Sequence, residues 1–220
     1  MGIDLAGLTK ISPYLYHVTY EASLGRIRSS RRLESAAVLL AEGGQSHRLR
    51  MRRDSLVEFV VDGEPIVLTD QSPVNPKNIA FQGGWSLPDL VEALNSRVFF
   101  WRGGLEGLLK ANQKHFGKYK SAGHRMIFLR LNFDETIKLN NQRGPELCNY
   151  NSGAARQSKG KPIPRGATTF VQPHCADFEA GEVQEVVFRG FVDLPATTEI
   201  CHGSWEGPWQ SLFHDGQHDA

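Results

Sequence analysis

Short apolar runs with a period of two recur along the chain and predict β-strands. Aromatic and β-branched residues nearly alternate with others from Pro13 to Thr19, and Met126–Phe133 places alternate apolar side chains on one face. A compact apolar run covers Arg97–Trp101. The stretch Gly181–Pro195 begins with a glycine, ends with a proline and is rich in β-branched and aromatic residues. It predicts a strand buried near the middle of a sheet.

A β-hairpin and several short helices are predicted between these strands. The apolar runs Leu56–Val61 and Pro65–Thr69 are separated by an Asp-Gly turn signal, which is typical of hairpins. The pattern over Glu21–Leu33 predicts a helix that turns its arginines outward. Ser86 is the predicted N-cap of a second helix, and the leucines within Leu105–Leu109 mark another short one.

Short strands interspersed with short helices, without long βαβ units, predict an α+β fold with a mostly antiparallel or mixed sheet. The chain has 220 residues, 40% of them hydrophobic, which suits a single domain with a substantial core. We expect the core to span about residues 13–195 and a C-terminal extension to span residues 196–220. The segment 140–172 is poor in apolar residues, which predicts a loop that is functional or disordered.

The overall charge does not point to a nucleic-acid or membrane partner, because the formal net charge is only +1. Arginines are concentrated between residues 26 and 53, where they form either a local basic face or a solvated helix face. The three cysteines form no C-x-x-C pair and favour reduced thiols. No apolar stretch has the length of a signal peptide or a membrane span, so we expect a cytoplasmic protein with no membrane contact.

Two of the cysteines adjoin histidines, as His174-Cys175 and Cys201-His202. Nitrogen and sulfur ligands of this kind suit a metal ion if the two pairs meet. Their spacing matches no familiar zinc pattern, so we expect no metal site.

Four polar features stand apart from the predicted core. His17 lies in the first strand and is either a satisfied interior histidine or a polar group in a cleft. The arginines of Arg48–Arg53 precede the hairpin and either bind a phosphate or stay in solvent. Polar loops at 151–154 and 162–166 are able to close over a ligand. Glu185 opens a strand and is either its solvated end or a functional acid, since burying an unpartnered carboxylate is costly.

The sequence lacks four common motifs of nucleotide-binding proteins and hydrolases, because it contains no Walker A, G-x-G-x-x-G, H-E-x-x-H or G-x-S-x-G sequence. What remains is a histidine on one strand, an arginine nearby and a glutamate at the start of another strand. Cleavage of the N-glycosidic bond of a dinucleotide needs an acid to stabilise an oxocarbenium-like centre and a cation for the pyrophosphate. The remaining set matches that requirement.

The order of these motifs resembles that of the DarT-type ADP-ribosyltransferases. Leu15–Thr19, followed by a helix with Leu24 and Ile27, is similar to the opening strand and helix of that family. Gln184–Pro195 is similar to the segment that carries the catalytic glutamate of the family. Four further segments resemble more closely a little-characterised bacterial family of hypothetical proteins with the same frame, namely Asp70–Pro73, Arg97–Trp101, Asn151–Ala154 and Pro164–Gly166.

The resemblance implies an ADP-ribosyltransferase-like fold, with a mixed, mostly antiparallel split β-sheet and short helices. It implies that NAD is a substrate and that Glu185 bonds the ribose hydroxyl and polarises the acceptor. It also implies that Arg50, Arg52 or Arg53 pairs with the phosphates, and we favour Arg53, which lies nearest the hairpin, as the catalytic arginine. The loop Phe178–Gln184 corresponds to the turn that reads the acceptor. The residues implied for NAD binding are His17, Thr19, Arg50, Arg52, Phe100, Trp101, Asn151 and Ser152.

We therefore expect an NAD-dependent mono-ADP-ribosyltransferase of bacterial type that modifies a nucleic acid or a nucleobase. A role as a toxin or in phage defence would add an antitoxin as a partner to be tested. Two alternatives stay open. One is a catalytically degenerate module of the same fold that binds nucleotide or nucleic acid without turnover, and the other is a structural or interaction domain in which His17 and Glu185 are satisfied polar residues.

Overall fold

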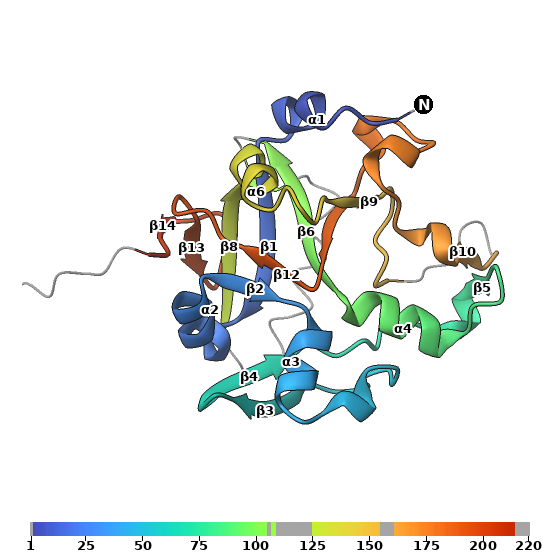
Figure 1. Ribbon diagram of the computed structural model, residues 1–220, viewed down its shortest axis with the longest axis horizontal. Helices are drawn as coiled ribbons and strands as arrows, with labels where there is room; N and C mark the ends of the chain where they lie inside the picture. The colour runs from blue at the N-terminus through green and yellow to red at the C-terminus, as the bar shows by residue number, and fades with distance from the viewer. Residues whose placement is uncertain (1, 105–106, 109–124, 155–160, 214–220) are drawn as a thin grey trace, which may run out of the picture.

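An eight-stranded antiparallel sheet forms the centre of the computed structural model (Figure 1). The structure describes residues 2–104, 107–108, 125–154 and 161–213. The strand order is β14-β13-β8-β1-β6-β11-β9, and β7 pairs with β6. The strands are β1 (Tyr14–Tyr20), β6 (Arg97–Gly104), β7 (Gly107–Leu108), β8 (Met126–Asn132), β9 (Glu146–Cys148), β11 (Glu185–Arg189), β13 (Glu199–His202) and β14 (Gln210–Ser211).

Two of the predicted strands are confirmed as β1 and β8, which pair along their whole lengths. Their alternating residues build the core on both faces of the sheet. On one face of the sheet, Leu15 and Leu129 are fully buried in the largest apolar cluster. On the other face, Tyr16 and Phe128 are buried in a second cluster. The prediction that one side of β8 lies fully in the core is therefore confirmed, and part of its other face is covered as well.

The pairing of β1 with β6 is much shorter than its pairing with β8. Only Tyr14, Leu15 and Tyr16 have partners on β6, whereas the first half of β6, from Arg97 to Trp101, is in register with β11. The sheet is therefore open between the second half of β1 and the first half of β6. This opening positions the cavity described below.

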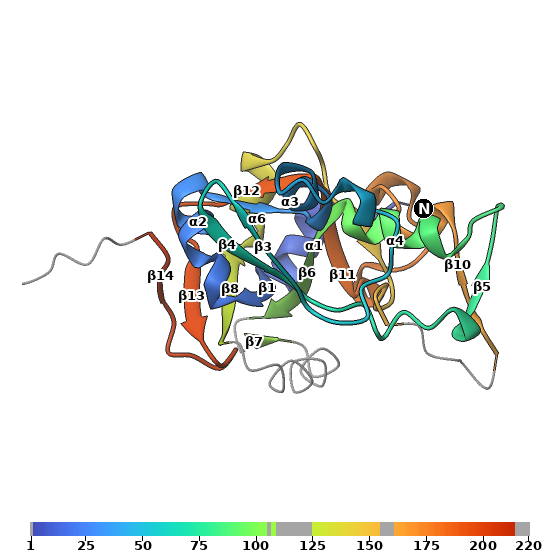
Figure 2. The same cartoon turned by 90° about the horizontal axis from the view of Figure 1, so that it is seen from below.

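Three two-stranded units flank the main sheet. Both views show β12 lying across one face of it, where Leu33 and Val192 join the largest apolar cluster (Figures 1 and 2). The hairpin predicted from the Asp-Gly signal is confirmed. The units are the antiparallel pairs β2 (Arg32–Glu34) with β12 (Phe191–Asp193) and β3 (Val57–Val61) with β4 (Glu64–Leu68), and the parallel pair β5 (Ile79–Phe81) with β10 (Ile163–Arg165).

The helices are short, and with the antiparallel sheet they confirm the coarse prediction of an α+β fold. The predicted N-cap at Ser86 is also confirmed, because Asp89 accepts hydrogen bonds from the Ser86 N–H (2.8 Å) and hydroxyl (2.5 Å). The helix that follows buries Leu90 and Val91 against the sheet. The α-helices are α1 (Leu5–Ile11), α2 (Leu24–Ser30), α3 (Ala36–Glu42), α4 (Leu87–Asn95) and α6 (Phe133–Leu139).

The helix predicted over Glu21–Leu33 is wrong in its length and in the placement of one arginine. It ends at Ser30, and Arg31 takes a φ of 55°, so that the chain turns back as β2. Arg26 points inward and is only 9% exposed. Its guanidinium is paired with the carboxylate of Glu34 at 2.5 and 3.0 Å, which stabilises the buried charge.

The stretch predicted as one strand before Pro195 is two strands with different partners. β11 belongs to the main sheet, next to its β9 edge rather than at its middle, and β12 pairs with β2. Gly190 lies between them with a φ of 75°. Glycine adopts this left-handed conformation at little cost, so it allows the chain to leave the sheet.

Gly190→Ala is therefore expected to lower the free energy of unfolding by about 1–2 kcal/mol. No atom lies within 4 Å of the added Cβ, so the cost is backbone strain alone. Gly181→Ala is the matched control, because its Cβ also meets open space but its φ is not in the left-handed region. Urea denaturation of both variants checks this, and equal losses of stability would contradict it.

Residues outside the expected core 13–195 also contribute to the fold. Leu8 of α1 is fully buried, and β13 pairs with β8 at the side opposite β1. The short helix predicted over Leu105–Leu109 lies largely outside the described residues, although Gly107 and Leu108 form β7. Among the helices that the structure describes, none combines the length and the apolar composition needed to cross a membrane.

Candidate functional site

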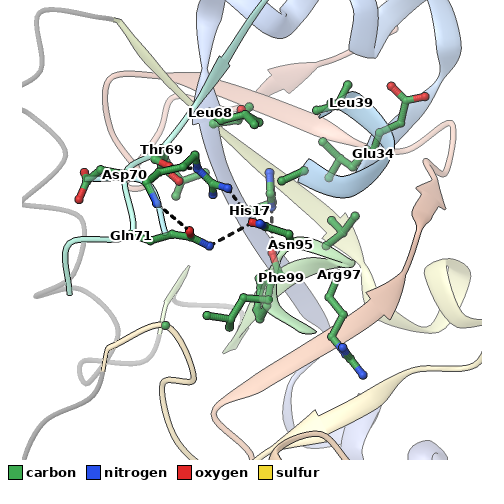
Figure 3. A pocket seen from close by; sticks show the side chains of 18 of the residues that line it. His17, Glu34, Leu39, Leu68, Thr69, Asp70, Gln71, Asn95, Arg97 and Phe99 are labelled. Atoms are coloured by element: carbon green, nitrogen blue, oxygen red, sulfur yellow. Dashed lines mark hydrogen bonds between the residues drawn. The ribbon is translucent and has the colours of Figure 1, made fainter. Parts of the chain in front are cut away.

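A cavity of about 610 Å³ lies where β1 and β6 separate. Its lining comes from β1, from the first half of β6, from the end of β4 and the loop after it, from β2, and from the turn at 151–154. Figure 3 shows part of this lining at close range. The volume falls within the range typical of small-molecule sites, about 300–1,000 Å³.

His17 lies at the point where the sheet opens. Its Nδ1–H donates to the carbonyl oxygen of Phe99 over 2.8 Å (Figure 3). Because β1 no longer pairs with β6 at this point, the side chain of His17 takes the place of a backbone hydrogen bond between the two strands. Burial lowers the pKa of His17 below its usual value of 6.5, so the ring is neutral at physiological pH. In this tautomer Nε2 carries a lone pair and can accept a hydrogen bond from a ligand hydroxyl.

Glu185 is the first residue of β11, as predicted, and it is 2% exposed rather than solvated. The register of β11 on β6 places it directly opposite Trp101, so the two side chains share a face of the sheet. The backbone N–H of Ser152 donates to its Oε2 over 3.1 Å. An acid at the start of a strand is thus enclosed by an aromatic neighbour and a polar turn.

Burial raises the pKa of Glu185 from 4.5 to about 7, because a desolvated carboxylate is less stable than the neutral acid. Hydrogen bonding by Ser152 and the positive charge of Arg165 offset this rise only in part. Both protonation states are therefore populated at neutral pH. A carboxyl group with this pKa is suited to accept and release a proton during a reaction.

Arg53 also lines the cavity and is 8% exposed. Its Nε donates to the carbonyl oxygen of Thr69 (2.8 Å), and Nη1 donates to Oδ1 of Asn95 (2.6 Å). Burial lowers its pKa to about 10, and the negative charge of Asp70 offsets part of this effect. The guanidinium therefore remains charged at neutral pH.

The opening in the sheet is what brings His17 and Glu185 to one cavity. Alternation along β1 puts His17 on the face opposite Tyr16, whereas the register across β6 puts Glu185 on the same face as Tyr16. Both nevertheless line the cavity, together with Val18 and Thr19, because side chains of either face reach the open edge of β1. A closed sheet would have kept them apart.

The structure brings together most, but not all, of the residues selected from the sequence. His17, Thr19, Arg53, Trp101, Asn151 and Glu185 line the cavity, and Ser152 contacts it through its hydrogen bond to Glu185. Three residues do not line it. Phe100 is fully buried in the largest apolar cluster, on the face of the sheet opposite to Trp101. Arg50 pairs with Asp89 on the surface, and Arg52 pairs with Asp54.

The comparison with known protein families gives one match, which covers most of the chain. A family model described as a family of unknown function (DUF7002) matches residues 13–193. The chain belongs to the DUF7002 family. No curated protein matches the chain, and no solved structure does so either. The region shared with DUF7002 runs from the start of β1 to the end of β12, so it includes all the residues that line the cavity.

Sequence reasoning missed three buried polar residues at this site of the DUF7002 chain. Asn95 and Gln71 are 1% and 8% exposed, and both contact Arg53. Arg165 is 1% exposed, and its Nη2 donates to the Asn151 carbonyl oxygen (3.2 Å) in the turn that presents Ser152 to Glu185. Asn95 ends an amphipathic helix and had no sequence signal. Gln71 and Arg165 lie in two segments noted for their family resemblance, Asp70–Pro73 and Pro164–Gly166, but neither residue was given a role.

The two histidine–cysteine pairs do not form a metal site in the described part of the chain. Cys175 is exposed in a short 3-10 turn, whereas Cys201 is buried in β13. No group of three or more His, Cys, Asp and Glu side chains that could hold a metal ion occurs among the described residues.

Proposed function

We propose that this protein is an NAD-dependent mono-ADP-ribosyltransferase whose reaction takes place in the cavity between β1 and β6. The observation that carries the proposal is the convergence of His17, Arg53 and Glu185, which are far apart in the sequence, on this one cavity. The opening of a mostly antiparallel sheet at this point supports the resemblance to DarT-type enzymes, which implies a split sheet.

The charges of the cavity are complementary to those of NAD. The nicotinamide end of NAD is a cationic pyridinium ring on ribose, and the middle of the molecule is an anionic pyrophosphate. Glu185, enclosed by Trp101 and the turn at Ser152, suits the cationic end, since a bound cation favours the ionised form of a carboxyl group. Arg53 suits the pyrophosphate, and Nε2 of His17 suits a ribose hydroxyl.

The proposed reaction breaks the bond between the ribose C1′ and the nicotinamide nitrogen. The bonding electron pair leaves with nicotinamide, which becomes neutral, and C1′ acquires oxocarbenium character. The ionised carboxylate of Glu185 stabilises this positive charge by hydrogen bonding the ribose hydroxyl. A lone pair of the acceptor then forms the new bond to C1′, and the proton of the acceptor passes to the carboxylate.

The function is tested by incubating the full chain with NAD labelled in its adenylate half. The reaction mixtures contain single-stranded DNA, RNA, nucleosides or protein as acceptors. We expect release of nicotinamide and transfer of label to a nucleic acid or a nucleobase. Saturation with NAD should also stabilise the protein, by about 2.7 kcal/mol at a hundredfold excess over the dissociation constant.

The outcomes separate the proposal from its alternatives. Stabilisation by NAD without release of nicotinamide would indicate a nucleotide-binding module without turnover. Neither stabilisation nor release would indicate that the cavity does not bind NAD, and the transferase function would be rejected. Labelling of protein alone would keep the reaction and contradict a nucleic-acid acceptor.

A further inference from the structure

Arg53 differs from the other arginines that line the cavity in the way its charge is compensated. Arg26 is paired with Glu34, Glu42 and Asp62. Arg97 is paired with Glu146 at 2.6 and 3.2 Å and turns its guanidinium away from His17 (Figure 3), and Arg32 is paired with Asp193. Arg53 forms no ion pair within 4 Å with any residue that the structure describes. The carboxylate of Asp70, which also lines the cavity, acts on Arg53 only from farther away.

A buried cation without a counterion is costly, because burial removes hydration that only a nearby anion or good hydrogen bonds can replace. The acceptors that Arg53 does have are neutral, namely the carbonyl oxygen of Thr69 and the side-chain amide oxygen of Asn95. These two contacts use two of the five guanidinium N–H groups. The other three have no described acceptor, and the residue lines the cavity.

Asn95 is the centre of the network that holds Arg53. Its Oδ1 accepts from Nη1 of Arg53 (2.6 Å) and from Nε2 of Gln71 (3.0 Å), and its own amide nitrogen donates to the carbonyl oxygen of Leu49 (2.8 Å). Gln71 closes the network, because its Oε1 accepts from the backbone N–H of Arg53 (3.1 Å). Figure 3 shows the bond between Gln71 and Asn95. The guanidinium is thus fixed in orientation without being neutralised.

We propose that Asn95, supported by Gln71, is a positioning residue that keeps the Arg53 guanidinium oriented and without a protein counterion, so that it binds the pyrophosphate group of a dinucleotide in the cavity. This inference rests on the proposed function for the identity of the dinucleotide. The anion site itself does not depend on any transfer of ADP-ribose. A carboxylate at position 95 would have the same shape and would pair with Arg53. The neutral amide of Asn95 instead leaves the positive charge of Arg53 free to bind an anionic ligand.

Asn95→Asp tests the proposal, because it changes one side-chain amide to a carboxylate without changing its size. The probes are inorganic pyrophosphate, ADP-ribose and, as an uncharged comparison, adenosine, measured by thermal shift and by calorimetry at constant ionic strength. For the wild type we expect pyrophosphate and ADP-ribose to bind. For Asn95→Asp we expect both to bind at least tenfold more weakly. We expect the variant to remain folded, because the new ion pair with Arg53 offsets the loss of the hydrogen bond that the amide donates to the Leu49 carbonyl oxygen.

Two further variants complete the experiment. Asn141→Asp adds the same charge at an exposed position and should leave pyrophosphate binding unchanged. Gln71→Glu adds a carboxylate to the same network and should weaken binding in the same direction as Asn95→Asp. If the wild type releases nicotinamide from NAD, Asn95→Asp should raise KM more than it lowers kcat.

Two results would overturn the proposal, namely unchanged pyrophosphate affinity in Asn95→Asp and no pyrophosphate binding by the wild type. The failure of this inference is distinguishable from that of the proposed function. If the wild type releases nicotinamide and Asn95→Asp leaves the pyrophosphate affinity unchanged, only the positioning role is rejected. If Asn95→Asp weakens pyrophosphate binding but the wild type releases no nicotinamide, only the transferase function is rejected.

Discussion

Glu185→Gln is expected to slow the release of nicotinamide from NAD by about 10²–10⁴-fold, the range typical of losing a group that acts in proton transfer. Glutamine has nearly the same shape, and its amide oxygen can still accept the hydrogen bond from the Ser152 N–H. It cannot carry the negative charge that stabilises an oxocarbenium-like ribose. We therefore expect the reaction to be lost while the fold is kept.

The measurement is single-turnover release of nicotinamide, with NAD binding followed separately by calorimetry. Glu182→Gln is a suitable control, because this glutamate lies three residues earlier, is exposed, and caps a turn through an oxygen that glutamine retains. The control should react like the wild type. A Glu185→Gln variant that releases nicotinamide at the wild-type rate would show that Glu185 has no role in the reaction.

The same substitution is expected to stabilise the protein above neutral pH. The pKa of Glu185 is about 7 in the folded protein and 4.5 ordinarily, so between these values the unfolded chain binds fewer protons than the folded one. The contribution of Glu185 to stability is fully present below pH 4.5 and is lost as the pH rises through 7. At about 1.4 kcal/mol per pH unit, the loss amounts to roughly 3 kcal/mol.

Glu185→Gln removes this titration, so its advantage over the wild type should grow by roughly 3 kcal/mol between pH 4.5 and pH 8. Urea denaturation of both proteins at the two pH values measures this change. Taking the difference between the two proteins cancels the opposite contribution of His17, whose pKa is lowered by burial. Parallel stability curves would mean that Glu185 is not held in a desolvated site.

Local signals in the sequence were sufficient for much of the fold. The Asp-Gly pair predicted the β3–β4 hairpin, and in the structure Asp62 and Gly63 take the positive φ values, 51° and 83°, that such a turn requires. The N-cap at Ser86 and the strands β1 and β8 were likewise confirmed. Each of these depends on residues close together in the chain.

Features that depend on distant partners were not predictable in the same way. The inward turn of Arg26 is caused by carboxylates from β2, α3 and the hairpin, which no pattern within α2 reveals. The sequence favoured Arg53 but assigned Arg50 and Arg52 to the site as well. Of these three only Arg53 reaches the cavity, because the loop after β4 folds back on it. Periodicity also assigns His17 to a single face and contains no sign that the sheet opens beside it.

The attachment of β13 to β8 has a practical consequence for work on this protein. The segment shared with DUF7002 ends before β13, which is the neighbour of β8 on the side away from β1. A shortened chain that stopped at Pro195 would leave the backbone of β8 as a free sheet edge and would uncover apolar side chains that Ile200 and Leu212 now bury. Unpaired, apolar edge strands promote aggregation, so the family segment alone is a poor substitute for the longer chain.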